Sequence, residues 1–400
     1  MSGAPTTFEA ILAPLGADQF LDEYLWKRPV HIEGPPDKWQ AVMNWGVLNR
    51  LLGMTSVWAS TSLMMMLDKK PLPASSYCYT ANGRDGGQVL RPDPVRVKGL
   101  LAQGATVVLN DIDQLTPELS RFCRVMEETL GAKFQANLYL SSQRRQGFKV
   151  HFDVHDVFAV HVMGEKTWMV FEGRAQDPIN HKLFMDLPAE HHEAAKGKLW
   201  KEVRLRPGDL LYLPRGQYHY ALADEGACVH IAFGATYPIG LDVISHLFER
   251  MVAEPVARAN FPRGGRAALA ARLAEIGERA KALLSDEATL NAMASFQAGF
   301  RYPRETYSLP EDTEPKEKRY SLKVGGLKLV EHAGRVGLTR AGTRQAVEIP
   351  VPLKGLMAWV LERKSFSRGE IGAAFPGESP ATVEQFLAEI NRMGLVDVEG

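Results

Sequence analysis

Short runs of apolar and β-branched residues, separated by turn residues, fill the middle of the chain and predict strands. These runs lie at about 135–141, 148–154, 157–163, 166–172, 201–206, 209–213, 219–223 and 227–235. Several short strands at this spacing are typical of a closed sandwich or barrel, and a double-sheet jelly roll fits them. The polar, helix-prone segment 177–200 predicts an insertion between two of the strands.

Apolar residues at helical spacing predict helices before this region. They recur through 7–30 and again through 45–52. Thr116 and Pro117 predict the start of a further helix, because threonine caps helix N-termini well and proline is tolerated in the first turn. This helix is predicted to end at Leu130, before a glycine.

The pattern changes after Pro238. Segments 241–259 and 265–299 are rich in alanine and leucine at helical spacing, which predicts amphipathic helices. The stretch 303–319 is rich in proline and charge and predicts a linker. Residues 320–400 then read as a small α+β unit that resembles a winged helix. Its predicted elements are helices at 356–361, from 367 and at 380–393, and a terminal strand at 395–398.

Length and composition bound the domain count and the class of protein. Four hundred residues predict two or three domains, which we place at 1–240, 241–310 and 320–400. A hydrophobic fraction of 45% and a charged fraction of 24% are ordinary for a globular protein.

Charge argues against direct nucleic-acid binding. The 47 basic and 47 acidic residues give a formal net charge of zero, whereas a non-specific nucleic-acid binder is usually basic. The last predicted helix carries Glu384, Gln385 and Glu389 against Arg392 alone, so it lacks the cations that track phosphates. We therefore expect a structural or protein-contacting role for 320–400.

Targeting signals and cysteines bear on location. No apolar run approaches the length of a membrane span, and the first residues lack the basic and apolar regions of a signal peptide. Cys78, Cys123 and Cys228 are far apart with no CxxC motif, which indicates free thiols in a reducing compartment. We expect a cytoplasmic protein without membrane contact.

The candidate chemistry centres on His151, Asp153 and His219. On a strand, residues two apart point to the same face, so His151 and Asp153 are predicted to project together. Two histidines and one carboxylate on one side of a metal leave positions open, as in non-haem Fe(II) oxygenases. A solvated strand face is the simpler interpretation of His-x-Asp alone, and the spacing would also suit Mn, Co or Ni.

Longer motifs surround these residues. They are the segment Phe20–Val30, Gln146-Gly147-Phe148 leading into His151-Phe152-Asp153, then Asp156-Val157-Phe158, Gly164-Glu165-Lys166-Thr167-Trp168, and the block Pro207–His219. With them, the stretch from about 20 to 237 resembles the JmjC-type 2-oxoglutarate oxygenases of the cupin superfamily. It is most similar to the ribosomal oxygenases, which hydroxylate ribosomal proteins.

The resemblance implies an α+β fold with a double-stranded β-helix core of the jelly-roll, cupin/JmjC type. It implies Fe(II) held by His151, Asp153 and His219, with 2-oxoglutarate as cosubstrate and O2. Lys166 matches the position that pairs with the distal carboxylate of the cosubstrate. Asn137 and Tyr139 match positions that line the pocket in histidine-hydroxylating members.

The implied reaction is hydroxylation of a protein side chain, an arginine or a histidine of a ribosomal protein, by a dioxygenase. In the resembling family, a region like 241–310 forms a helical dimerisation module, which implies a homodimer. Two alternatives stay open: an oxygenase of a small molecule or peptide natural product, and a non-enzymatic JmjC-like binding protein. His155 is also in phase with His151 and Asp153 on the predicted strand, but lies too far along it to share one metal easily.

Overall fold

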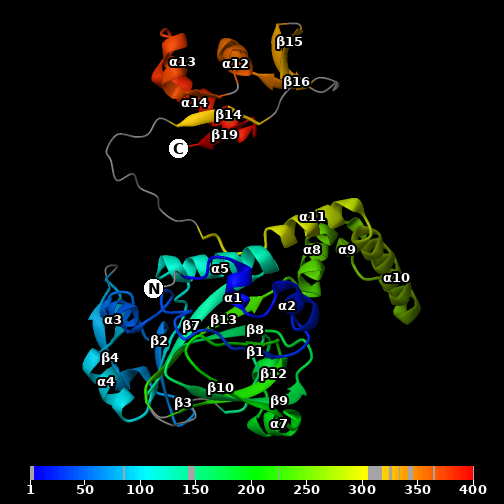
Figure 1. Cartoon of the computed structure of the whole chain (residues 1–400). Coiled ribbons are helices and arrows are strands. Elements are labelled where there is room, and N and C mark those ends of the chain that lie inside the picture. Colours follow the sequence, from blue (N-terminus) through cyan, green and yellow to red (C-terminus); the bar gives the residue numbers. More distant parts are fainter. Residues whose placement is uncertain are drawn as a thin grey trace. The chain divides into compact units, whose positions relative to one another are not determined.

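The chain divides into two compact units, Met1–Glu305 and Thr306–Gly400, in a computed structural model (Figure 1). The structure describes residues 4–83, 86–142, 149–224, 226–304, 318–323, 327–332, 334–340, 346–363 and 365–399. Within these ranges no helix has both the length and the apolar character needed to cross a membrane.

Two antiparallel sheets build the centre of the first unit. The larger sheet has the order β1-β11-β8-β13-β7-β6-β2-β3 and the smaller has the order β10-β9-β12. Their strands are β1 Val30–Ile32, β2 Leu63–Leu67, β3 Lys70–Pro71, β6 Thr106–Leu109, β7 Lys133–Ser141, β8 Asp156–Met163, β9 Lys166–Arg174, β10 Leu199–Leu205, β11 Leu210–Leu213, β12 Gln217–Ala223 and β13 Cys228–Thr236. Seven of the eight predicted strands are therefore present.

Period-two alternation on β8 and β11 explains how the sheets stack. Val157 and Ala159 of β8 join a buried cluster with Trp168 of the smaller sheet, while Phe158 points to the opposite face. Because both of its faces are covered, β8 is buried along its whole length. Strands buried on both faces have nearly continuous apolar sequences, as this one does. Two sheets closed over one cluster form the cupin-type core that the sequence predicts.

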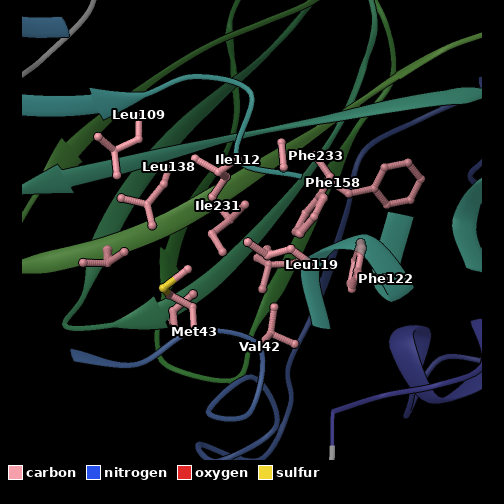
Figure 2. Close-up of a cluster of buried hydrophobic side chains, with 14 of the residues drawn as sticks. Val42, Met43, Leu109, Ile112, Leu119, Phe122, Leu138, Phe158, Ile231 and Phe233 are labelled. Atoms are coloured by element: carbon pink, nitrogen blue, oxygen red, sulfur yellow. The ribbon is translucent and has the colours of Figure 1, made fainter. Parts of the chain in front are cut away.

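The outer face of the larger sheet carries the main core of the unit. Figure 2 shows Phe122 of α5 beside Phe233 of β13, and the two rings stack with centroids 4.0 Å apart. The covering elements are α1 Phe8–Leu12, α2 Ala17–Glu23, α3 Trp45–Gly53, α4 Pro94–Ala102 and α5 Pro117–Leu130, with the short helix Ala74–Ser76 and the hairpin β4 Cys78–Asn82 and β5 Gln88–Pro92.

The ends of α5 confirm the sequence prediction. The hydroxyl of Thr116 accepts a hydrogen bond from the amide of Leu119 at 3.2 Å, and Pro117 occupies the first turn. Gly131 closes the helix in the left-handed conformation with φ of 61°, which glycine adopts without steric cost.

The prediction of one helical run through 7–30 is wrong. The helices α1 and α2 are short, and α2 ends at Glu23. Trp26, three residues later, has φ of 60°, a left-handed conformation through which no helix can continue, and its amide donates to the hydroxyl of Tyr212 at 2.9 Å. The β-branched residues that follow form β1, which pairs with β11, because this edge of the sheet offers a hydrogen-bonding partner.

The prediction of a regular strand at 148–154 is also wrong. Residues 149–155 are irregular apart from a single bridge between His151 and His219. Phe152 turns away into a separate cluster with Val150, Phe171 and Tyr218, so the segment follows side-chain packing rather than a continuous ladder. Gln146, Gly147 and Phe148 of the motif lie outside the described residues.

Helices make up the rest of the first unit. The predicted insertion 177–200 contains α6 Lys182–Met185 and α7 Ala189–Ala195, and the last part of the unit contains α8 Gly240–Val252, α9 Pro255–Arg258, α10 Gly265–Leu284 and α11 Glu287–Ala298 (Figure 1). Arg250 of α8 forms an ion pair with Asp286 at 2.7 Å, which ties α8 to the start of α11. The helical character predicted for 241–299 is confirmed.

The predicted linker is wrong at Arg304. Arg304 is buried, and its guanidinium forms ion pairs of 2.7 Å with Glu127 and with Asp113. Residue 304 therefore belongs to the packed first unit, which the Pro-rich composition did not reveal. Residues 305–317 of the predicted linker lie outside the described part.

The second unit is a small α+β unit with a core of its own. Its elements are β14 Arg319–Leu322, β15 Leu327–His332, β16 Arg335–Arg340, β17 Ala346–Ile349, a short helix Val351–Leu353, α12 Lys354–Leu361, β18 Ser365–Ser367, α13 Arg368–Ala374, α14 Pro380–Arg392 and β19 Val396–Glu399. One sheet has the order β18-β14-β19 and the other β15-β16-β17. The three helices and the terminal strand are confirmed, and the second sheet was not foreseen.

Candidate metal centre

A pair of backbone hydrogen bonds brings together residues that are far apart in sequence. The amide of His151 donates to the carbonyl of His219 at 3.1 Å, and the reverse bond is 2.9 Å. The amide of Gly216 donates to the carbonyl of Asp153 at 2.9 Å. Gly216 has φ of 85°, and a Cβ there would lie 2.0 Å from the carbonyl oxygen of Ala175, so only glycine fits this turn.

The side chains of His151, Asp153 and His219 converge. One possible ligand atom from each lies within 4.8 Å of the other two, and no second group of three is found in the described part of the chain. Nε2 of His219 is 3.6 Å from a carboxylate oxygen of Asp153. The triad predicted from sequence therefore comes together in space, and its role as a metal centre remains our prediction.

Hydrogen bonds at the back of each imidazole select the tautomer. Nδ1 of His151 lies 2.8 Å from the carbonyl oxygen of Lys149, and Nδ1 of His219 lies 2.9 Å from that of Gln217. A carbonyl oxygen only accepts, so both Nδ1 atoms carry the proton. Each Nε2 then keeps a lone pair for a metal, the usual arrangement of a metal-binding histidine.

The surroundings of His219 and Asp153 also set the protonation states in which these side chains can bind a metal. Burial, with His151 nearby, lowers the pKa of His219 to about 4. Burial opposes the charge on Asp153, but His151 and His219 outweigh it and hold the pKa of this carboxyl below its usual value. At neutral pH His219 is therefore neutral and Asp153 is a carboxylate, the states in which both bind metals.

The triad opens on a cavity of about 210 Å³ between the two sheets. Its other lining residues are Thr106, Tyr139, Val157, Lys166, Trp168, Ala221, His230 and Ala232. Ala221 and Ala232 are small and leave room, while Trp168 stacks on His219 with ring centroids 5.5 Å apart. The cavity can hold a small molecule beside the three candidate ligands.

Lys166 brings a buried positive charge to this cavity. The residue is 7% exposed, and burial lowers the pKa of its ammonium group. Among the described residues its ammonium group forms neither an ion pair nor a hydrogen bond. An unpaired buried charge is costly, so Lys166 is placed to receive an anion.

Tyr139 and Asn137 lie on the same face of β7, but only Tyr139 lines the cavity. Burial and nearby Asp153 raise the pKa of Tyr139, so its hydroxyl stays protonated. The side-chain oxygen of Asn137 accepts a hydrogen bond from the amide of Asp111 at 3.0 Å, which engages it at the sheet edge. Cosubstrate contacts by either residue remain predictions.

Three other residues complete the site's surroundings. His155 lies outside the metal-binding group; its ring packs against Gly234, where a Cβ would come within 2.8 Å. Trp168 and His230 line the cavity although neither was singled out as a pocket residue. Trp168 lies two residues after Lys166 on β9, which is a readable signal, whereas His230 depends on strand register.

The described geometry falls within a segment that matches a family model. The model for the JmjC domain matches residues 108–243, which include the triad and Lys166. The remainder of the chain lies outside that match.

The chain is also similar to curated proteins. The chain is 27% identical over 228 residues to Ribosomal oxygenase 1 of Rattus norvegicus, covering 56% of this chain and 35% of the rat protein. It is 30% identical over 132 residues to the bifunctional lysine-specific demethylase and histidyl-hydroxylase NO66 of Drosophila simulans, covering 33% of this chain and 15% of the fly protein. The chain thus spans about a third or less of the length of these relatives.

Among solved structures, the ribosomal oxygenase YcfD of Escherichia coli in complex with cobalt and 2-oxoglutarate aligns over 97% of this chain and 99% of its own. The sequence identity is 17% and the TM-score is 0.47.

Proposed function

We propose that this chain is an Fe(II)- and 2-oxoglutarate-dependent oxygenase that hydroxylates a protein side chain. One observation carries the proposal: a single cavity is lined by His151, Asp153 and His219 and by the unpaired buried cation Lys166. A dicarboxylate that chelates a metal needs open metal positions and a fixed cation for its distal end. The residues present fit both requirements.

Each side chain has a definable task in this reaction. His151 and His219 would hold Fe(II) through Nε2, and Asp153 would add a carboxylate oxygen. Lys166 would orient 2-oxoglutarate by pairing with its distal carboxylate, and Tyr139 would line the same cavity. When bound, the metal and cosubstrate supply the activation of O2 and the oxidation of a C–H bond, which no side chain here provides.

We propose that the substrate is an arginine or a histidine of a ribosomal protein. Support comes from the names of the relatives, a ribosomal oxygenase and a histidyl-hydroxylase, and from the match of residues 108–243 to the JmjC domain model. Asn137 and Tyr139, close together on β7, favour histidine by the resemblance noted from sequence.

The test is succinate formation from 2-oxoglutarate by the Fe(II)-loaded protein, with and without purified ribosomal proteins. We expect ribosomal proteins to stimulate turnover and one of them to gain the mass of one oxygen atom by mass spectrometry. Stimulation by a small metabolite or a peptide natural product instead would favour that alternative. No turnover under any of these conditions would contradict the proposal of an oxygenase. The alternative of a non-enzymatic JmjC-like binding protein would then remain.

We also propose that 241–310 forms a homodimer contact. Four apolar residues of α8 recur at helical spacing and are exposed: Leu241, Ile244, Phe248 and Val252. Ten of the exposed large apolar side chains in the described residues lie between 241 and 296, and such gatherings mark association surfaces.

Phe248→Glu is expected to shift the protein from dimer to monomer, because Phe248 is 66% exposed on that face and a buried carboxylate in the contact would be unpaired. Light scattering coupled to gel filtration measures the mass. Val95→Glu, at an exposed apolar residue of α4, is the matched control and should stay dimeric. A parent protein of monomer mass would contradict the proposal.

For the second unit we propose a winged-helix-like domain with a protein-contacting role at 320–400. The helices α12, α13 and α14 beside the sheet β18-β14-β19 support it, and the balanced charge of α14, where Arg392 pairs with Glu389, disfavours direct nucleic-acid binding.

We also propose a cytoplasmic location, which the buried free cysteines Cys78, Cys123 and Cys228 support.

A further inference from the structure

His230 is held rigidly in the wall of the cavity. It lies on β13 directly across from Tyr139 of β7, and the two rings stack with centroids 4.7 Å apart and an interplanar angle of 7°. Trp168 meets it edge to face at 5.4 Å. Packing on two sides fixes the orientation of the imidazole, which is 3% exposed.

The imidazole of His230 has no hydrogen-bond partner among the described residues, and its Nδ1 is fully buried. The two candidate ligands His151 and His219 each have a carbonyl partner instead. A buried polar group without a partner costs about 1–3 kcal/mol. A ligand in the cavity cannot reach the fully buried Nδ1, so only Nε2, when it carries the proton, can donate a hydrogen bond to a ligand there.

His230 and Lys166 line the same cavity. Burial, followed by the positive charge of Lys166, lowers the pKa of His230 well below its usual value, so the ring is neutral. A neutral imidazole still offers one N–H donor and one acceptor. His230 therefore adds a donor beside Lys166 without adding a second buried charge.

We propose that His230 donates a hydrogen bond to the 2-oxoglutarate carboxylate that pairs with Lys166. This role rests on the proposed function and names a further anchor in the same site. A carboxylate has two oxygens with several acceptor positions, so in a buried cavity it can accept a hydrogen bond from a second donor besides the ammonium group of Lys166. A rigid N–H donor next to the cation supplies the second contact at little cost in side-chain freedom.

The test measures cosubstrate binding by calorimetry with the Co(II)-loaded protein. His230→Phe keeps an aromatic ring to stack on Tyr139 and removes the donor. We expect its affinity for 2-oxoglutarate to fall by about 10- to 100-fold, the range for a hydrogen bond to a charged group. His230→Gln retains an N–H donor and should recover part of the affinity. Binding of 2-oxovalerate, which lacks the distal carboxylate, should be unchanged in both variants.

The ligand pair separates this role from a structural one. Equal loss for 2-oxoglutarate and 2-oxovalerate, or equal 2-oxoglutarate affinity in the parent and His230→Phe, would overturn the role of His230 and leave the proposed function intact. A parent protein that binds Co(II) but no 2-oxoglutarate would overturn the proposed function itself. If His230→Phe does not fold, His230→Gln and His230→Asn decide the question. His230→Gln retains the N–H donor and should bind 2-oxoglutarate more tightly than His230→Asn, whose shorter side chain misplaces the donor.

Discussion

His219→Ala is expected to abolish metal-dependent turnover of 2-oxoglutarate, with a loss of at least about 1000-fold. The substitution removes one of three candidate ligands, and its Nε2 faces the carboxylate of Asp153 at 3.6 Å. His151 and Asp153 alone hold a metal weakly and cannot fix which positions remain open. The measurements are succinate formation with Fe(II) and Co(II) affinity by calorimetry, which should fall by at least about 100-fold.

The matched control is His191→Ala, which removes an imidazole from an exposed position of α7. It should retain both turnover and Co(II) affinity, so any general effect of losing a histidine is excluded. A fully active His219→Ala protein would show that the triad is not the metal centre. Unchanged Co(II) affinity with lost turnover would instead assign His219 to a later step of the reaction.

Arg304→Met is expected to lower the free energy of unfolding of the first unit by about 3–5 kcal/mol. The guanidinium is buried between Glu127 and Asp113, at 2.7 Å from each, and it also donates to the carbonyl of Phe134. Burial opposes the charge, but the bonds to Glu127 and Asp113 hold the pKa of Arg304 above its usual value. Methionine fills much of the volume and leaves two buried carboxylates unpaired.

Denaturant unfolding followed by tryptophan fluorescence measures this effect, because six of the seven tryptophans lie before residue 305. Arg28→Met is the control: Arg28 pairs with Glu23 at 2.7 Å, but both side chains are about half exposed, so the cost should stay within about 1 kcal/mol. Equal effects of the two substitutions would show that the buried ion pairs around Arg304 do not hold the end of the first unit.

Local chemistry was enough to predict much of the fold. The ends of α5 follow from Thr116, Pro117 and Gly131, since caps act through neighbouring residues only. Most strands of the core follow from apolar runs such as β8, which is buried on both faces. The errors arose where a distant partner decides the structure, as for Val30–Ile32, which becomes a strand because β11 lies beside it.

For the site, the sequence by itself singled out the candidate residues: His151, Asp153, Lys166 and His219 were all proposed from motifs, spacing and the family resemblance. Only the tertiary structure decided how they meet. The bridge that joins His151 to His219 is formed by backbone atoms 68 positions apart, and no local pattern encodes such a pairing. The same applies to His230, since strand register alone sets it across from Tyr139 and in the wall of the cavity.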